Sequence, residues 1–262
     1  MEDCVSIATR RFPLWIVVIA LLAGAGPRAQ QTPNRESSAR ERAREPYTAG
    51  LEQMRREDFA AARKSFEAAI AIEPTFELAH FMLGRVHLAQ KEFAPAAAAL
   101  TRARDLYVAQ AGRQFANKQE AQRHRRERIA EIEGLINNLQ GVTPQTFQIR
   151  EQIRQLEERK RQVEDLDRAK DLTPEQVVPA FVSLSLGSAH FRQGKLAEAE
   201  QAYLAAVAAD PKTGEAHNNL AVVYLQTGRY AQAKAAVRAA ERAGVKVHPE
   251  LKAEINAKAG GN

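Results

Sequence analysis

The sequence has almost none of the features by which a β-sheet is recognised. It shows no sustained alternation of apolar and polar residues, and no Asn-Gly or Asp-Gly pair marks a hairpin turn. Aromatic residues make up only 6% of the chain although the apolar fraction is 45%, so the core must consist largely of Ala, Leu, Val and Ile. Because small side chains let helices approach one another closely, this composition predicts an all-α fold.

Residue patterns that carry chemistry are also missing. Cys4 is the single cysteine and cannot form an intramolecular disulfide, and no haem-attachment motif, phosphate-binding glycine loop or nucleophile elbow occurs. His80 and His87 lie on the same face of one predicted helix, but no Cys, Asp or Glu completes a zinc ligand set. We therefore predict that the protein is not an enzyme and that it holds no metal or cofactor.

The charge balance is only modestly basic. The chain carries 38 Lys and Arg residues against 32 Asp and Glu residues, a formal net charge of +6. An excess of this size supports solubility and a weak attraction to anionic surfaces. The most basic stretch could contact nucleic acid, anionic lipid or an acidic partner through Arg123, Arg125, Arg126 and Arg128. Nearby glutamates and the lack of stacking aromatics favour a solvated helix face instead, so nucleic acid is not an expected partner.

The N-terminus has the composition of an export signal. A basic pair, Arg10 and Arg11, precedes an apolar run from Phe12 to Ala25, and small residues follow, which is the order of a secretory signal peptide. About 14 apolar residues fall short of the roughly 20 that a helix needs to cross a bilayer. Residues 1–25 are therefore predicted to be a cleaved signal peptide or, alternatively, a retained membrane anchor of an exported bacterial protein, periplasmic or secreted. Residues 26–44 are polar, contain prolines and predict a flexible linker.

The strongest pattern is an internal repeat with a period of about 34 residues. It is clearest in residues 181–245, where small, aromatic and apolar landmarks recur one period later. The landmarks of the first copy are Leu186, Gly187, His190, Gly194, Ala199, Tyr203, Ala206 and Pro211, and their partners are Leu220, Ala221, Tyr224, Gly228, Ala233, Val237, Ala240 and Val245. The same frame begins at Tyr47, where it relates Gly50 to Gly84. Each unit is predicted to be two helices joined by a tight turn, with small residues where the helices meet.

This frame resembles the tetratricopeptide repeat (TPR) family. The resemblance implies a short solenoid of four helix-turn-helix units in two pairs, residues 45–110 and 173–245, followed by a capping helix and tail over 246–262. In that family the first helices of successive units line a concave groove that binds segments of other proteins. With the predicted export, the resemblance implies a scaffold or assembly factor of the cell envelope whose partners are proteins or peptides. The implied groove residues are Tyr47, Leu51, Met54, Arg55, Leu78, Phe81, Arg85, Leu88, Phe181, Leu184, Phe191, Arg192, Asn218, Val222 and Leu225.

Residues 111–172, between the two pairs, lose the repeat frame. They are predicted to form a helical hairpin whose arms pair as a short antiparallel coiled coil, although two decayed repeats remain the alternative. The outgoing arm is expected to continue the helix that contains Pro95, with Gly112 and Gly134 as weak points. The apolar seam consists of Ile129, Ile132, Ile136 and Leu139 on the outgoing arm and Ile149, Ile153, Leu156, Lys160 and Val163 on the return arm.

The insert also leaves alternatives for architecture and function. Because it separates the two repeat pairs, these need not stack on each other in the ordinary way. If the hairpin associates with a second copy, the protein would be a structural oligomer or a membrane-proximal tether. A third possible function is that of an accessory subunit of an enzyme complex.

Overall fold

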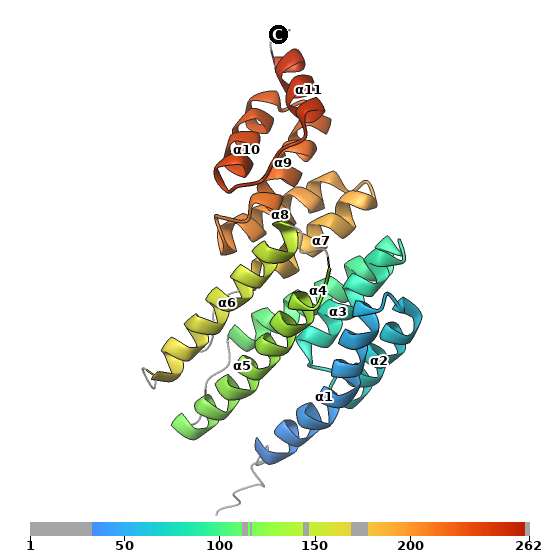
Figure 1. Cartoon of the computed structure of the whole chain (residues 1–262), viewed down its shortest axis with the longest axis vertical. Helices are drawn as coiled ribbons and strands as arrows, with labels where there is room; N and C mark the ends of the chain where they lie inside the picture. The colour runs from blue at the N-terminus through green and yellow to red at the C-terminus, as the bar shows by residue number, and fades with distance from the viewer. Residues whose placement is uncertain (1–32, 112–114, 116, 144–146, 169–177, 260–262) are drawn as a thin grey trace, which may run out of the picture. The chain divides into compact units, whose positions relative to one another are not determined.

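The computed structural model describes residues 33–111, 115, 117–143, 147–168 and 178–259 (Figure 1). All regular elements in these ranges are α-helices, which confirms the predicted all-α class. The signal peptide or anchor predicted for residues 1–25 lies outside the described residues, and no helix within them is long and apolar enough to span a membrane. Contacts divide the chain into residues 1–32 and 33–262, and all described helices belong to the second unit.

The four predicted units are present as pairs of helices. Within each unit the two helices pack on each other, α1 on α2, α3 on α4, α7 on α8 and α9 on α10. A last helix, α11 (Pro249–Ala259), packs on α10 and buries Ile255. The repeat helices are α1 (Pro33–Arg55), α2 (Phe59–Ile72), α3 (Glu77–Ala89), α4 (Phe93–Ala111), α7 (Ala180–Arg192), α8 (Leu196–Ala209), α9 (Gly214–Gln226) and α10 (Tyr230–Arg242).

The two pairs of units stack directly on each other despite the insert. Helix α4 packs on α7, as α2 packs on α3 and α8 on α9. At this junction Gln193 Nε2 donates a hydrogen bond to the carbonyl oxygen of Phe93 at 2.9 Å, and the ring centroids of Phe81 and Phe181 lie 4.8 Å apart. The solenoid is therefore continuous across the insertion.

Packing explains the glycine that the repeat places where the two helices of a unit meet. A Cβ atom added to Gly84 would lie 2.5 Å from Leu100 Cγ, and one added to Gly187 would lie 2.6 Å from the ring of Tyr203. Both distances are far inside van der Waals contact, so any larger residue would push the helices apart. The small residue at this position is a requirement of the core.

The turn inside each unit contains one residue in the left-handed conformation. In the third and fourth units this residue is Gly194, with φ of 76°, and Gly228, with φ of 72°. In the first and second units it is Glu57, with φ of 60°, and Lys91, with φ of 63°. A residue with a Cβ atom loses about 1–2 kcal/mol in this conformation, whereas glycine adopts it readily. The first two turns are therefore more strained than the last two.

The flexible linker predicted for residues 26–44 is wrong for residues 33–44. Helix α1 already begins at Pro33. Its first half is held against the rest of the fold, because Ala43 is fully buried and Arg40 forms ion pairs with carboxylates of other helices. These long-range contacts have no signature in the local composition.

The single long helix expected to run from Pro95 through the outgoing arm is interrupted. Helix α4 ends at Ala111, and the next helix, α5, begins at Lys118. The side chain of Asn117 caps the new helix by accepting a hydrogen bond from the backbone N–H of Glu120 at 2.9 Å. An asparagine cap satisfies one of the free N–H groups of a helix start, which favours a new helix here over continuation.

Helices α5 (Lys118–Gln140) and α6 (Phe147–Arg168) pack on each other in the insert (Figure 1). Their antiparallel register is defined at two points. Lys160 Nζ lies 2.6 Å from a carboxylate oxygen of Glu133, and Arg125 donates a hydrogen bond to the carbonyl oxygen of Leu166 at 2.9 Å. A coiled-coil geometry for the two arms stays a prediction. Seam residues buried in the same core as the first repeats are Ile132, Ile136, Leu139, Leu156 and Val163.

Candidate functional site

Helices α1, α3, α7 and α9 are the first helices of the four units and contact one another across the inner face of the solenoid. This is where the resemblance places a groove. The predicted groove residues lie on all of them: Tyr47, Leu51, Met54 and Arg55 on α1, Leu78, Phe81, Arg85 and Leu88 on α3, Phe181, Leu184, Phe191 and Arg192 on α7, and Asn218, Val222 and Leu225 on α9.

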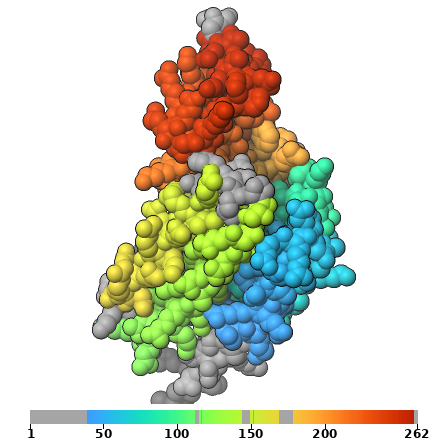
Figure 2. Space-filling model, in the orientation of Figure 1, coloured from blue at the N-terminus to red at the C-terminus, as the bar shows by residue number. Residues whose placement is uncertain are grey.

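The hairpin covers the part of this face that the first repeats contribute. Helix α5 packs on α1, and Asn138 Nδ2 donates a hydrogen bond to the carbonyl oxygen of Leu51 at 2.8 Å. The exposed fractions of the covered groove residues are small: Tyr47 3%, Leu51 6%, Leu78 1%, Phe81 4% and Leu184 8%. In Figure 2 the surface of α5 adjoins that of α1, and the surface of α6 lies on the other side of α5. These side chains contact the chain's own insert, so their contact with a partner stays a prediction.

Other groove residues keep access to solvent. They lie mainly toward the C-terminal ends of the first helices and along α9. Leu225 is 8% exposed and belongs to the core of the second repeat pair. The residues that are partly or fully exposed are Met54, Arg55, Arg85, Leu88, Phe181, Phe191, Arg192, Asn218 and Val222.

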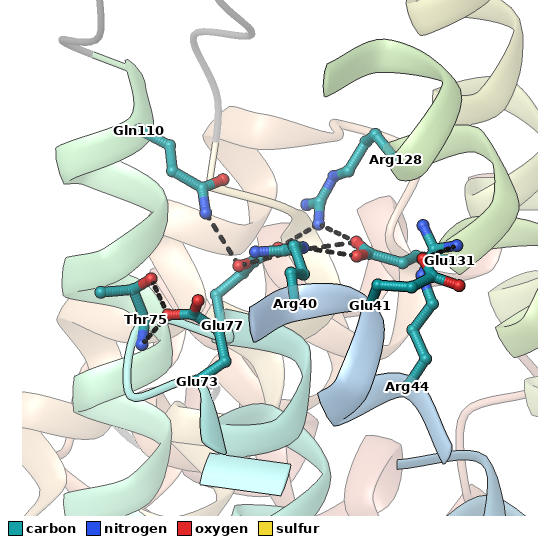
Figure 3. Close-up of polar contacts among 9 residues, drawn as sticks. All are labelled: Arg40, Glu41, Arg44, Glu73, Thr75, Glu77, Gln110, Arg128 and Glu131. Carbon is teal, nitrogen blue, oxygen red and sulfur yellow. Dashed lines mark hydrogen bonds and ion pairs between the residues drawn. The ribbon is translucent and has the colours of Figure 1, made fainter. Parts of the chain in front are cut away.

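A buried cluster of charges attaches the hairpin to the repeats (Figure 3). Arg40 of α1 lies 2.7 Å from a carboxylate oxygen of Glu131 on α5 and 2.9 Å from one of Glu77 on α3. Arg128 of α5 also pairs with Glu77, and Gln110 Nε2 of α4 donates to the same carboxylate at 2.8 Å. Two cations and two anions thus balance within a site joining α1, α3, α4 and α5. We call these residues, with Gln110, the ionic cluster.

The electrostatics of the ionic cluster keep its groups charged. Burial alone would raise the pKa of the Glu77 carboxyl, but Arg40 and Arg128 outweigh it and hold the pKa far below its usual range. Burial would lower the pKa of Arg40, yet Glu131 and Glu77 together raise it well above its ordinary value. Each charge is therefore stabilised only while its partners are present.

Aromatic rings enclose the ionic cluster. The guanidinium carbon of Arg40 lies 4.7 Å from the ring centroid of Phe76, and that of Arg128 lies 4.8 Å from the ring centroid of Tyr107. Burial is the largest of the effects that together raise the pKa of the Tyr107 hydroxyl to about 12. Water-poor surroundings of this kind strengthen both cation–π and ionic contacts.

The basic stretch, for which the sequence favours a solvated helix face over a partner contact, does not form one surface. Arg125 is 2% exposed and Arg128 is 3% exposed, and both face the interior of the fold. Arg123 and Arg126 are exposed. A surface contact through Arg125 and Arg128 is therefore wrong for this conformation. The sequence shows a run of arginines but not which of them are buried. The buried face of α5 is set by its contacts with α1 and α3, which the local sequence does not reveal.

Three histidines make structural contacts. His80 Nε2 lies 3.0 Å from the carbonyl oxygen of Pro74, and His217 Nε2 lies 3.0 Å from that of Pro211, so each ties its helix to the preceding turn. His87 Nδ1 lies 2.5 Å from a carboxylate oxygen of Glu92. Among the described residues no group of three or more His, Cys, Asp or Glu is placed to hold a metal ion.

Comparison with known proteins agrees with the repeat geometry. The tetratricopeptide repeat family model matches residues 47–111 and 184–244, which contain α2 to α4 and α8 to α10 and parts of α1 and α7. Residues 47–111 and 184–244 are tetratricopeptide repeats. No curated protein sequence matches it at a significant level.

Solved structures align with most of the chain at low sequence identity. PilW, a widely conserved type IV pilus biogenesis factor, is 16% identical, with 83% of this chain and 86% of PilW covered and a TM-score of 0.39. TTC0263, a thermophilic TPR protein of Thermus thermophilus, is 20% identical, with 82% and 98% covered and a TM-score of 0.33. PilF of Pseudomonas aeruginosa is 15% identical, with 79% of each chain covered and a TM-score of 0.31.

Proposed function

We propose that this TPR protein is a non-enzymatic interaction module that binds a segment of a partner protein along the inner face of its third and fourth repeats. The observation that carries the proposal is that solvent exposure differs between the two halves of the inner face. In the first repeats Tyr47, Leu51 and Phe81 are buried beside residues of α5, whereas Phe191, Asn218 and Val222 in the later repeats keep access to solvent. Partly exposed apolar side chains on parallel first helices suit an apolar or amphipathic segment.

The insert supports the same mode of binding. Helix α5 packs on α1, pairs with α3 through Arg128 and Glu77, and turns apolar side chains inward, which is how an amphipathic helix lies in a groove. The fold thus already holds one helix of its own on this face, and the free part offers the same kind of surface. A role as a scaffold or assembly factor of the cell envelope is part of the proposal and rests on the predicted export signal.

Self-association through the hairpin has less support. The apolar seam of α5 and α6 is buried in the core that the hairpin shares with the first repeats. Large exposed hydrophobic side chains in the described residues are Ile72, Val108 and Leu204, which lie on repeat helices. The hairpin therefore offers little apolar surface to a second copy.

Site-specific photocrosslinking in the source cells tests the proposal. A photoreactive residue at Asn218 on the inner face should give a defined crosslinked partner, and one at the exposed Ala98 of α4 should not. Substituting Val222→Glu should abolish the Asn218 crosslink, because a buried carboxylate would replace an apolar contact. The matched substitution Ala98→Glu should leave it intact. Equal crosslinking from both faces, or a product that survives Val222→Glu, would contradict binding at this face.

A further inference from the structure

The exposed side of α10 carries a stripe of positive charge. Lys234, Arg238 and Arg242 recur at intervals of four residues, so they line up along one side of the helix over about 12 Å. All three side chains are exposed, and none forms an ion pair or a hydrogen bond with a residue that the structure describes. A carboxylate oxygen of Glu241, the one acidic residue of α10, lies 2.9 Å from Nζ of Lys252 on α11 instead. We call Lys234, Arg238 and Arg242 the α10 stripe.

The repeat frame does not require basic residues at these positions. In the other three units the corresponding positions hold a mixture of charged, polar and apolar residues, and the charged ones all have ion-pair partners. The α10 stripe therefore differs from its counterparts in carrying one sign of charge without partners among the described residues. The corresponding residues are Arg63, Glu67 and Ala71 on α2, Ala97, Thr101 and Asp105 on α4, and Glu200, Leu204 and Ala208 on α8, and the ion pairs are Arg63–Glu67, Arg104–Asp105 and Arg229–Glu200.

The α10 stripe also contributes nothing to the packing of its own helix. Like charges four residues apart on a helix repel each other and lower the stability of the helix. Only Arg242, in the last turn, is favourably placed with respect to the helix dipole. Because the stripe is unfavourable for α10 and is not needed in the core, it is a candidate for contact with a molecule of opposite charge. The residues that α10 buries lie on its other side and are Ala233, Ala236, Val237 and Ala240.

We propose that the α10 stripe docks an acidic helix of a partner protein, with carboxylates spaced four residues apart. Such a helix repeats its carboxylates about every 6 Å, which is the spacing of the basic side chains on α10. Ala231 and Ala235 are exposed beside the stripe, and their small side chains let a second helix approach closely. The surface belongs to a second helix of the repeats and not to the inner face, so it adds a contact of different chemistry to the proposed function.

A membrane surface fits the α10 stripe less well than a helix does. A protein that lies on a bilayer inserts large apolar side chains beside its basic ones. The large exposed hydrophobic side chains of the described residues are Ile72, Val108 and Leu204, and none of them is on α10. The stripe is also only one helix wide, which matches the width of another helix.

Two helical peptides of identical composition and charge test the proposal. In one, glutamates stand at every fourth position on a single face, and in the other the same residues are reordered so that the glutamates surround the helix. Each is titrated into the full chain while the backbone amide signals are followed by NMR and the affinity by fluorescence anisotropy. The single-face peptide should bind at least fivefold more tightly, should shift the signals of α10, and should bind more weakly as salt is added. Vesicles of phosphatidylglycerol are the third probe and should leave the α10 signals unchanged.

Matched variants show whether the stripe itself carries the contact. Lys234→Gln/Arg238→Gln/Arg242→Gln should weaken binding of the single-face peptide roughly three- to hundredfold, the loss expected for three exposed ion pairs. The control removes the same charge from exposed residues on α2, α4 and the turn before α8, and should leave the affinity unchanged; it is Lys64→Gln/Arg102→Gln/Lys195→Gln. Lys234→Gln/Arg238→Gln should melt no lower than the wild type, because only repulsion is removed.

Several outcomes would overturn the proposal. Equal binding of the two peptides, or equal loss in the two triple variants, would reduce the stripe to a general attraction of opposite charges. Tighter binding of the vesicles than of the single-face peptide through α10 would assign the stripe to a membrane. A lower melting temperature of Lys234→Gln/Arg238→Gln would show that the stripe serves the fold. Each result is independent of crosslinking at Asn218, so this proposal and the proposed function can fail separately.

Discussion

Breaking the ionic cluster should detach the hairpin from the repeats. Glu77→Gln keeps the shape of the side chain but leaves Arg40 and Arg128 with only Glu131 as an anionic partner in a site where Glu77 is 0% exposed. Removing one partner of a buried ion pair usually costs about 3–5 kcal/mol. Because a domain is stable by only about 5–15 kcal/mol, this loss should be plain in urea unfolding followed by circular dichroism.

The matched control removes a carboxylate from an exposed ion pair. Glu67 pairs with Arg63 at 2.9 Å, but the two side chains are 49% and 43% exposed. Glu67→Gln should therefore change the free energy of unfolding by no more than about 0.5 kcal/mol. Hydrogen exchange gives a local test, since Glu77→Gln should speed exchange in α5 and leave α9 and α10 unchanged.

A second variant separates lost charge balance from lost contacts. In Glu77→Gln/Arg128→Met the cluster is neutral again, and the Arg40–Glu131 pair at 2.7 Å remains. The double variant should therefore be more stable than Glu77→Gln alone, with strong coupling between the two sites. The reasoning would be refuted if Glu77→Gln cost no more than Glu67→Gln, or if the effects of the two single substitutions were simply additive.

Further predictions concern pH, packing and turn strain. The pKa of Glu77 is lowered in the folded state, so its contribution to stability is present above its ordinary value of 4.5 and should be lost as pH falls below that value, which urea unfolding at pH 3 to 7 measures. Gly187→Ala should lower the free energy of unfolding by about 1–3 kcal/mol, because its new Cβ clashes with Tyr203. Gly134→Ala should raise the free energy of unfolding by about 0.5–1 kcal/mol, because no atom lies within 4 Å of its new Cβ. A stabilising Gly187→Ala or a destabilising Gly134→Ala would contradict the packing account. Lys91→Gly should relieve the left-handed turn at φ of 63° and raise the melting temperature, and a drop would show that the turn is unstrained.

The repeat was predictable from sequence because its landmarks are imposed by local contacts. Gly84 and Gly187 each face a side chain of the same unit, so the same collision recurs at each period and leaves the same small residue behind. The turns at Gly194 and Gly228 are likewise set within a unit. Such constraints repeat with the chain and can be read from one sequence.

The position of the hairpin was not predictable in this way. The amphipathic pattern of α5 and α6 indicates that they bury a seam, but the same pattern would serve a free coiled coil or a hairpin folded onto the repeats. What decides is the pairing of Arg40 with Glu131, which lie 91 residues apart in sequence. Arg128 shows the same limit, since a basic run looks like a solvated face until its partner Glu77 is known.

Because the hairpin covers part of the groove that the sequence implies, substituting the groove residue Phe81 by Glu is a poor probe of partner binding. Phe81 is 4% exposed and lines the interface with the hairpin, so a carboxylate there would disturb the fold itself. Val222, which is partly exposed on α9, tests the inner face without touching the insert.

The surface of the first repeats that the hairpin covers is synthesised before the hairpin itself. Helices α1 to α4 end at Ala111, and α6 ends only at Arg168. At the usual 5–20 residues per second, the ribosome needs roughly 3 to 11 s to add the intervening chain. During that interval the nascent first repeats expose Tyr47, Leu78 and Phe81 with no occupant. We expect the first repeats to be most open to other helices during this interval, because α5 is not yet there to cover this face.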